Sequence, residues 1–373
     1  MTGWLANLGL VVSSSLVALV MSDILAVLAN PKFSCSSREA NFYQADPTRG
    51  WVMKPRVRAS LCDAGYRYEV RTNEHGFRDE DWPKKGVRQI LLVGDSVAFG
   101  MPLPADQGIS VKLERLGHGN LAVYNAGAVG YGPPHILATM VQLCNELKFD
   151  HILFLYFFND IRADNMDLRA VQVVDGYLVP SVKPDGGEYN MEEIREQIRR
   201  STAHGLTLAD VLTLYHLRAT LADAHVHPRQ LLERVGLLGG GSNYYERYLF
   251  TARIDEYPEE RLRQAASIVA QMRETASRCG AQFTVVVLPT DAEAYYGLRE
   301  PATDRFLALL TAHDLHIVDV RPRTRRGQAI HIHKDGHFND AGTTFAAEQL
   351  LEVVTDKVAP GVPTSVDRGF SSR

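Results

Sequence analysis

Residues 90–96 read Ile90-Leu91-Leu92-Val93-Gly94-Asp95-Ser96, an apolar run that ends in a glycine and two polar residues. The β-rich apolar residues predict a buried strand, and Gly94 marks its end. Asp95 or Ser96 can then cap the following helix. The Ser96 hydroxyl would face the unpaired N–H groups at the helix start, which favour negative charge. A turn with an N-cap has the same pattern, so the interpretation depends on other parts of the chain.

Three further segments place small or polar residues after predicted strands. Val123–Gly132 runs from a strand end into a loop of small residues, which lets backbone N–H groups approach a substrate. His151–Phe158 is apolar enough for a strand buried on both faces, and Asn159 follows it. Lys334–Gly342 contains His337 and a carboxylate, and leads into an amphipathic helix from about residue 343 to 358. Functional groups collect beyond the carboxyl ends of parallel strands, so the segments predict one site suited to acyl transfer.

The predicted strands alternate with helical stretches along the chain. They lie near residues 89–94, 121–125, 150–157, 282–288 and 315–320. This alternation predicts an α/β fold, a three-layer α/β/α sandwich with a doubly wound parallel sheet of about five strands. Glu259–Arg278 has its apolar residues on one stripe, as in a helix that faces a core. Residues 161–255 are too many for an ordinary crossover and are interpreted as an insertion.

In order and separation, the four segments resemble the motif blocks of the SGNH or GDSL hydrolases, a family with a flavodoxin-like fold. The resemblance covers roughly residues 88–160 and 282–350. It implies that Ser96 is the nucleophile, that His337 is the base and that Asp335 supports His337. It also implies an oxyanion hole made by the Ser96 N–H, the Gly130 N–H and the Asn159 amide.

The chain agrees with the family's second block and departs from its last block. Gly130 is preferred to Gly127 as the backbone donor because it lies five residues after Asn125, as the family's second block implies. The family's usual last block is Asp-x-x-His, whereas this chain has Asp335-Gly336-His337. The shorter form resembles the membrane-anchored and polysaccharide O-acetylation branches.

The function implied is a serine-dependent hydrolase that cleaves short-chain acyl esters, such as acetyl esters on glycans or lipids, without a cofactor. Two alternatives remain open: a polysaccharide O-acyltransferase with the same residues, and a noncatalytic binding or assembly protein. A metal site is a rival for the same loop, because His331, His333, Asp335 and His337 recur at every second residue. Neighbours on one strand cannot easily surround a metal, and no second ligand cluster is evident, so no metal is expected.

Composition predicts one enzyme-sized globular domain with appendages. The 373 residues are 45% hydrophobic and 23% charged, close to the globular average. A formal net charge of −4 gives no sign of a nucleic-acid surface. The expected substrate is an acylated small molecule or carbohydrate.

The N-terminal residues 1–30 are interpreted as a membrane anchor. Only Asp23 is ionisable between Trp4 and Ala29, and the segment is long enough to cross a bilayer core of about 30 Å as a helix. A cleaved signal peptide is the alternative, although no basic residues precede the apolar run. The positive-inside rule, applied to the basic residues that follow, would retain the domain in the cytoplasm. The family resemblance instead implies an extracytoplasmic, periplasmic domain.

The remaining predictions concern cysteines and appendages. Cys35 and Cys62 could form a disulfide in an oxidising compartment, whereas Cys144 and Cys279 are interpreted as buried thiols. An extended lead-in is expected over 31–87, where His75 is assigned a turn role, then a hydrolase-like domain over 88–360 and a tail over 361–373. By its position after Asn159 the insertion would wall the site. Four aromatic residues of the insertion would form a platform for a sugar ring: Tyr244, Tyr245, Tyr248 and Phe250.

Overall fold

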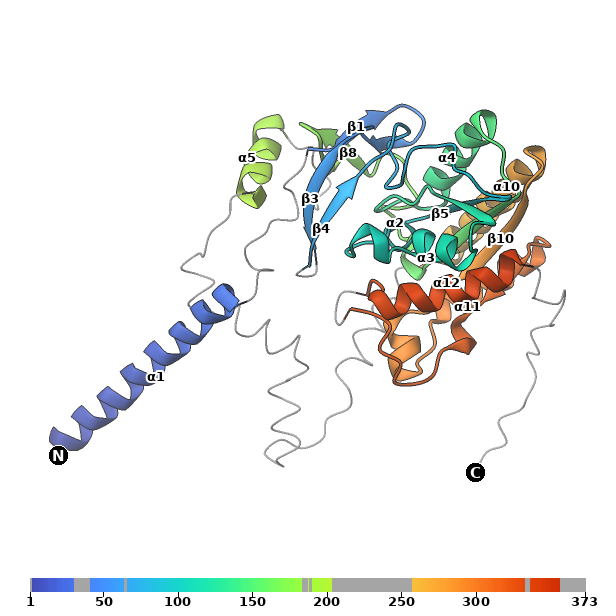
Figure 1. Cartoon of the computed structure of the whole chain (residues 1–373). Coiled ribbons are helices and arrows are strands. Elements are labelled where there is room, and N and C mark those ends of the chain that lie inside the picture. Colours follow the sequence, from blue (N-terminus) through green and yellow to red (C-terminus); the bar gives the residue numbers. More distant parts are fainter. Residues whose placement is uncertain are drawn as a thin grey trace, which may run out of the picture.

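A five-stranded parallel sheet forms the centre of the computed structural model (Figure 1), which describes residues 2–29, 41–63, 66–182, 187, 190–202, 257–332 and 336–355. Its strands are β5 (Arg88–Gly94), β6 (Leu121–Asn125), β7 (His151–Tyr156), β10 (Gln282–Val287) and β11 (Ile317–Asp319). Their order is β11-β10-β7-β5-β6, and every neighbouring pair is parallel. The predicted parallel α/β sheet is therefore confirmed. The chain reverses its direction of winding at β5, and in such sheets ligands bind beyond the carboxyl ends at this switch point.

Helices cover both faces of this sheet. Residues of α4 (Pro133–Glu146) and α10 (Glu259–Arg278) share one apolar cluster with Leu91 and Val93 of β5. The opposite cluster joins Ile90 and Leu92 to α2 (Ser96–Phe99), α3 (Ile109–Leu116) and α12 (Asp340–Val354). Successive side chains of a strand point to opposite faces, so one apolar run supplies both clusters. The remaining elements of this part are η2 (Ala105–Gln107), η3 (Phe158–Ile161), the π-helix η4 (Ala292–Tyr296), α11 (Pro301–Ala312) and η5 (Arg321–Arg323).

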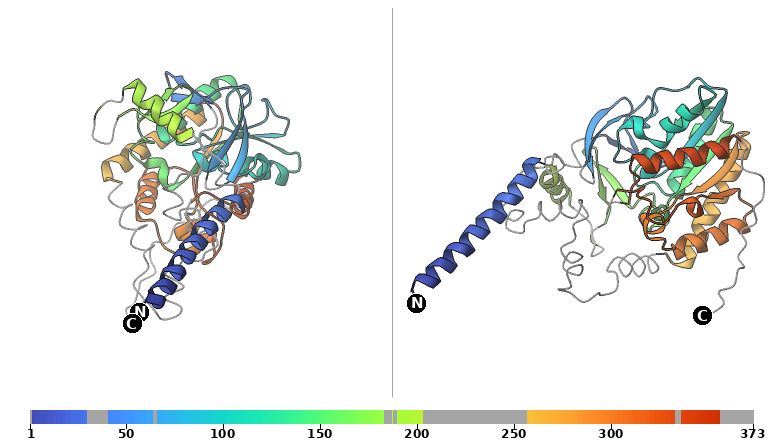
Figure 2. Two further views of the ribbon diagram at one scale, coloured as in Figure 1. Left: turned by 90° about the vertical axis from the view of Figure 1, so that its left-hand side faces the viewer. Right: turned by 60° about the horizontal axis from the view of Figure 1, so that its bottom comes forward.

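The lead-in is more regular than the expected extended chain. It forms two antiparallel hairpins, β1 (Tyr43–Asp46) with β2 (Gly50–Met53), and β3 (Arg58–Asp63) with β4 (Tyr66–Arg71). Both lie at one end of the sandwich in the views of Figures 1 and 2. The start of the insertion adds a third hairpin, β8 (Val171–Val174) with β9 (Tyr177–Pro180), and the helix α5 (Met191–Thr202). Of these elements, β8 lies beside β1. The aromatic platform expected over 244–250 and the tail over 361–373 lie outside the described residues.

The N-terminal segment forms the helix α1 (Thr2–Ala29). Among the helices that the structure describes, none combines the length and the apolar character needed to cross a membrane. The prediction of a transmembrane helix is therefore not supported. Ser13-Ser14-Ser15 and Asp23 interrupt the apolar residues of this helix and lower its hydropathy.

A disulfide joins Cys144 of α4 to Cys279 at the end of α10. The prediction that these cysteines are separate buried thiols is wrong. Their Cα atoms are 5.7 Å apart although 135 residues separate them in the chain, because α4 and α10 pack side by side on one face of the sheet. Cys35, one half of the predicted pair, lies outside the described residues.

Candidate active site

Ser96 is the first residue of the short helix α2, directly after the strand β5. Of the two possible N-caps, Asp95 has this role: its Oδ1 accepts a 2.9 Å hydrogen bond from the Val97 N–H. The close approach of strand and helix requires Gly94, because a Cβ there would lie 2.9 Å from the Ala98 side chain and 3.0 Å from the Leu155 carbonyl oxygen. The local sequence thus places Ser96 at the carboxyl end of a central strand.

His337 reaches Ser96 from a loop 241 residues further along the chain. Its Nε2 lies 2.8 Å from the Ser96 Oγ, which is the hydrogen-bond distance expected between a serine nucleophile and its base. Backbone bonds hold the loop, since the Ile332 N–H donates to the His337 carbonyl at 2.8 Å. Asn339 then caps α12 by accepting from the Gly342 N–H at 3.0 Å. These hydrogen bonds therefore hold the turn that carries the His337 imidazole.

Lys112 of α3 bonds to residues at the start of α12, and both helices pack on the face of the sheet that α2 covers. Its Nζ lies 2.6 Å from the Asp340 carbonyl oxygen and 2.7 Å from Asp340 Oδ1. It also donates to the hydroxyls of Thr343 and Thr344 at 2.9 and 2.7 Å. These contacts begin three residues after His337, so they restrict the position of His337 relative to Ser96.

Asn159 lies on η3, just beyond β7, the neighbour of β5 in the sheet. Its Nδ2 donates to Asp95 Oδ2 at 3.0 Å, and the same oxygen is 3.3 Å from Ser96 Oγ. An amide nitrogen carries two N–H groups, and no described residue other than Asp95 accepts from this one. The arrangement brings Ser96, Asn159 and His337 around the buried carboxyl group of Asp95.

Burial raises the pKa of Asp95, while the Val97 N–H, the nearby His337 and the Asn159 amide act in the opposite direction. Burial also raises the pKa of Asp160 well above its ordinary value, and the charge of Asp95 adds to that shift. The negative charge of Asp95 therefore disfavours the ionised form of Asp160.

The structure distinguishes the two candidate oxyanion glycines. The Gly127 N–H donates to Asn125 Oδ1 at 2.9 Å, and a Cβ on Gly127 would lie 2.4 Å from the Phe99 backbone nitrogen. Gly130 has a φ of +80°, and a Cβ there would meet only the Trp51 ring, at 4.0 Å. No described residue accepts a hydrogen bond from the Gly130 N–H. Gly127 thus serves packing, and Gly130 stays the predicted backbone donor.

Asp335, predicted to support His337, lies outside the described residues, as does His333 of the metal alternative. His331 is buried, with its Nε2 3.0 Å from the Pro289 carbonyl oxygen and its ring against Phe338. Within the part of the chain that the structure describes, no three His, Cys, Asp or Glu side chains are grouped so that they could hold a metal ion.

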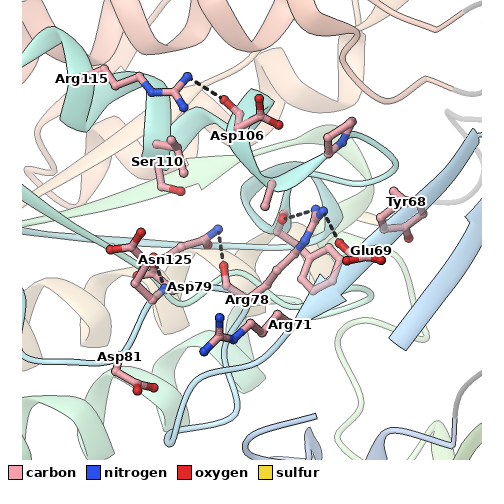
Figure 3. Close-up of a pocket in the computed structure, with 16 residues that line it drawn as sticks. Tyr68, Glu69, Arg71, Arg78, Asp79, Asp81, Asp106, Ser110, Arg115 and Asn125 are labelled. Carbon is pink, nitrogen blue, oxygen red and sulfur yellow. Dashed lines mark hydrogen bonds between the residues drawn. The ribbon is translucent and has the colours of Figure 1, made fainter. Parts of the chain in front are cut away.

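Arg78 is a site neighbour that the sequence analysis missed. Its Nη1 donates to the carbonyls of Phe99 and Gly100 at 3.3 and 2.9 Å, and its Nη2 to those of Leu103 and Glu69 at 2.7 and 3.0 Å. The guanidinium lies 5.2 Å from the Tyr68 ring centre and 5.1 Å from that of Phe99. Burial lowers its pKa to about 10. Arg78 thus binds the carboxyl end of α2 and joins it to the lead-in (Figure 3).

Trp51 of β2 is a second missed neighbour. Its carbonyl accepts a 2.7 Å hydrogen bond from the Tyr131 hydroxyl, and the two rings lie 4.7 Å apart. Tyr131 follows Gly130 directly, so β2 of the lead-in packs against the loop that carries the predicted oxyanion donor. His75 contacts Trp82 and Glu146 instead, consistent with a structural role. No local sequence signal marks Arg78 or Trp51, because each acts on a loop far along the chain.

No protein-family profile matches the chain. No curated protein matches it either. Solved structures with a similar arrangement include TesA, which is 14% identical, with 73% of this chain and 100% of that chain covered and a TM-score of 0.39.

A putative lipolytic protein of the G-D-S-L family from Desulfitobacterium hafniense is 9% identical, over 71% of this chain and 99% of that one, with a TM-score of 0.38. The acetyl xylan esterase AlAXEase is 10% identical over the same shares, also with a TM-score of 0.38. At these identities and TM-scores the similarity does not bear on the reaction, and the geometry of the site is the basis for the function.

Proposed function

We propose that this chain is a serine-dependent hydrolase of short-chain acyl esters, of the SGNH or GDSL type. The observation that carries the proposal is the 2.8 Å hydrogen bond between Ser96 Oγ and His337 Nε2 at the switch point of a parallel sheet. A serine hydroxyl is a weak nucleophile until a base takes its proton. The bond supports the proposal that the His337 imidazole is this base.

In the proposed reaction His337 removes the Ser96 proton as the Oγ attacks the ester carbonyl carbon. The carbonyl oxygen becomes an oxyanion, which accepts hydrogen bonds from the Ser96 N–H, the Gly130 N–H and the second N–H of Asn159. Loss of one such donor costs about 3–4 kcal/mol of barrier in comparable sites. The imidazolium then returns its proton to the departing alcohol, which leaves an acyl-serine.

Water completes the reaction. His337 takes a proton from a water molecule that attacks the acyl carbon, and then gives it to Ser96 Oγ as the bond from the acyl carbon to Oγ breaks. This step releases the carboxylic acid and restores the serine hydroxyl. Asp335 is the proposed partner of the second imidazole nitrogen, where a carboxylate would hold the tautomer that the attack requires. A sugar hydroxyl in place of this water would make the same residues an acyltransferase.

We also propose that the domain works in an oxidising, extracytoplasmic compartment. The Cys144–Cys279 disulfide supports this proposal, since disulfides persist in such compartments and are rare in reducing ones. Labelling of the cysteines in intact cells with a thiol reagent, before and after reduction, tests it. Free thiols at both positions before reduction would contradict the proposal.

The hydrolase proposal is tested with p-nitrophenyl acetate and the Ser96→Ala and His337→Ala variants. Exposed residues of the same types provide matched controls, Ser277→Ala on α10 and His118→Ala after α3. We expect both site variants to lose at least a hundredfold in kcat/KM, and both controls to keep it. Activity that survives Ser96→Ala would refute the serine mechanism. Activity on sugar acceptors but not on water would identify a transferase.

A further inference from the structure

Asp95 is a buried carboxyl group to which the proposed reaction gives no part. It is fully buried and stands between the last residue of β5 and the first residue of α2. Both of its oxygens accept hydrogen bonds from N–H groups. Oδ1 accepts from the Val97 N–H at 2.9 Å, and Oδ2 accepts from Asn159 Nδ2 at 3.0 Å. One carboxyl group therefore joins the first turn of α2 to the predicted oxyanion donor on η3.

The bond to Asp95 determines how the Asn159 amide is oriented. An amide has a donor end and an acceptor end, and a half-turn about the last side-chain bond exchanges them. An ionised carboxyl group only accepts, so Asp95 selects the orientation that turns the nitrogen of Asn159 toward it. The acceptor end, Asn159 Oδ1, is buried and has no hydrogen-bond partner in the described part of the chain. Among the described residues, the orientation of this amide therefore depends on Asp95.

The Ser96 hydroxyl also lies near the Asp95 carboxyl group, but at a longer distance than its bond to the base. Ser96 Oγ is 3.3 Å from Asp95 Oδ2 and 2.8 Å from His337 Nε2. A hydroxyl has one proton to donate, and the shorter contact directs it to His337. Asn159 is thus the main partner of Asp95 Oδ2.

We infer that Asp95 is a positioning residue of the oxyanion hole, which holds the Asn159 amide so that its second N–H is presented to the oxyanion of the reacting ester. This inference rests on the proposed hydrolase function and adds a residue to its machinery. Asp95 touches no substrate and acts through Asn159. A donor that is oriented before the reaction stabilises the oxyanion without a cost of reorganisation, whereas the reversed amide would turn a carbonyl oxygen toward the negative charge.

Two substitutions separate this role from the cap of α2. Asparagine has one acceptor oxygen, so Asp95→Asn must lose either the bond from Val97 or the bond from Asn159. Serine is a good N-cap residue, so Asp95→Ser keeps an acceptor for the Val97 N–H and removes the acceptor of Asn159. Asp319→Asn is the matched control, because both Asp319 oxygens accept from Arg321 at the end of β11, two strands away from β7.

The kinetic test is a double-mutant cycle in the full-length chain with p-nitrophenyl acetate. Loss of one oxyanion donor costs about a hundred- to a thousandfold in kcat. We expect Asp95→Ser and Asp95→Asn to lower kcat about tenfold or more and to leave KM within about twofold. In the Asn159→Ala background the same changes should lower kcat by less than about twofold, since the amide that they release is absent. Asp319→Asn should keep kcat in both backgrounds.

The cycle distinguishes positioning from a purely structural role. If Asp95 only stabilised the fold, its replacement would lower kcat by the same factor with and without the Asn159 amide. Equal factors in the two backgrounds would therefore overturn the inference, as would an Asp95→Ser protein that is folded and has wild-type kcat.

A measurement without turnover separates failure of this inference from failure of the proposed function. In isotope-labelled protein, the NMR signals of the Asn159 side-chain N–H pair are those that disappear in Asn159→Ala. We expect their exchange with water to be slower than that of the exposed Asn120 in the wild type, and to become faster in Asp95→Ser but not in Asp319→Asn.

The outcomes of this measurement are independent of esterase activity. A slowed Asn159 pair that Asp95→Ser releases, in a chain without esterase activity, would overturn only the hydrolase proposal. An Asn159 pair that exchanges in the wild type as fast as that of Asn120 would overturn the inference, even if no Asp95 variant folds.

Discussion

Replacement of Arg78 tests whether the lead-in positions the nucleophile. The Arg78→Met change removes four hydrogen bonds to carbonyl oxygens, one on the last residue of α2, two in the turn that follows it and one in β4. A buried acceptor left without a partner costs about 1–3 kcal/mol. The costs overlap when acceptors share one donor group, so we expect the free energy of unfolding to fall by about 3–5 kcal/mol.

The effect on catalysis should be larger than this loss of folded protein explains. Arg78 holds the carboxyl end of a helix of only four residues whose first residue is Ser96. A displacement of about 1 Å at a reacting group can cost about a hundredfold in rate. For the folded fraction of Arg78→Met we therefore expect kcat to fall ten- to a hundredfold with little change in KM. Arg78→Lys, which keeps the charge and some donors, should recover part of this loss.

The assay is p-nitrophenyl acetate hydrolysis, with the folded fraction of each variant obtained from urea unfolding followed by circular dichroism. Arg273→Met is the matched control, because Arg273 also donates to two backbone carbonyls, those of His313 and Asp314. We expect it to lose stability and keep kcat. A folded Arg78→Met protein with wild-type kcat would show that Arg78 only stabilises the fold, and would refute the reasoning.

Three further predictions concern stability and the glycine loop. Reduction of the disulfide between α4 and α10, or Ser in place of either cysteine, should lower the free energy of unfolding by about 2–5 kcal/mol in urea titrations and leave kcat of the folded protein unchanged. Burial lowers the pKa of His135 to about 4, so the stability that its neutral form contributes is present above the ordinary pKa of 6.5 and is lost as pH falls toward 4. Between pH 7.5 and 5 this loss should be about 2 kcal/mol in the wild type and absent in His135→Gln, and equal slopes would contradict it. Gly127→Ala should unfold at a lower temperature than Gly130→Ala, because the added Cβ overlaps the backbone of α2. Gly130→Ala should lose only the stability that a positive φ costs, about 1–2 kcal/mol, and its kcat should fall by more than this loss of stability explains. Equal melting temperatures for the two glycine variants would show that this packing distinction is wrong.

Most of the sheet could be predicted from the sequence because its signals are local. The five apolar runs form the five parallel strands, and the Gly94-Asp95-Ser96 turn has the predicted strand-to-helix geometry. Strands buried on both faces need continuous apolar runs, which are easy to distinguish from their polar flanks. The positions of Asn159 and Ser96 at the carboxyl ends of neighbouring strands follow from the same reasoning.

The sequence pattern was less informative where distant segments meet. It misassigned Cys144 and Cys279, and it gave the lead-in no role at the site, although Arg78 and Trp51 contact the nucleophile helix and the glycine loop. A cysteine's partner depends on which helices share a face of the sheet. An arginine's partner depends on which carbonyls a turn leaves unpaired. Residue spacing along the chain predicts neither the cysteine's partner nor the arginine's.

The sequence by itself determined the α/β class, the strand limits and the residue types available for acyl transfer, since these depend on local hydrophobicity, turn chemistry and strand polarity. Only the tertiary structure decided that His337 Nε2 bonds to Ser96, that Asp95 rather than Ser96 caps α2, and that Arg78 of the lead-in donates to the carbonyls at the end of α2. The physical reason is that such contacts join segments up to 241 residues apart. Their formation depends on the packing of whole helices and hairpins against one sheet.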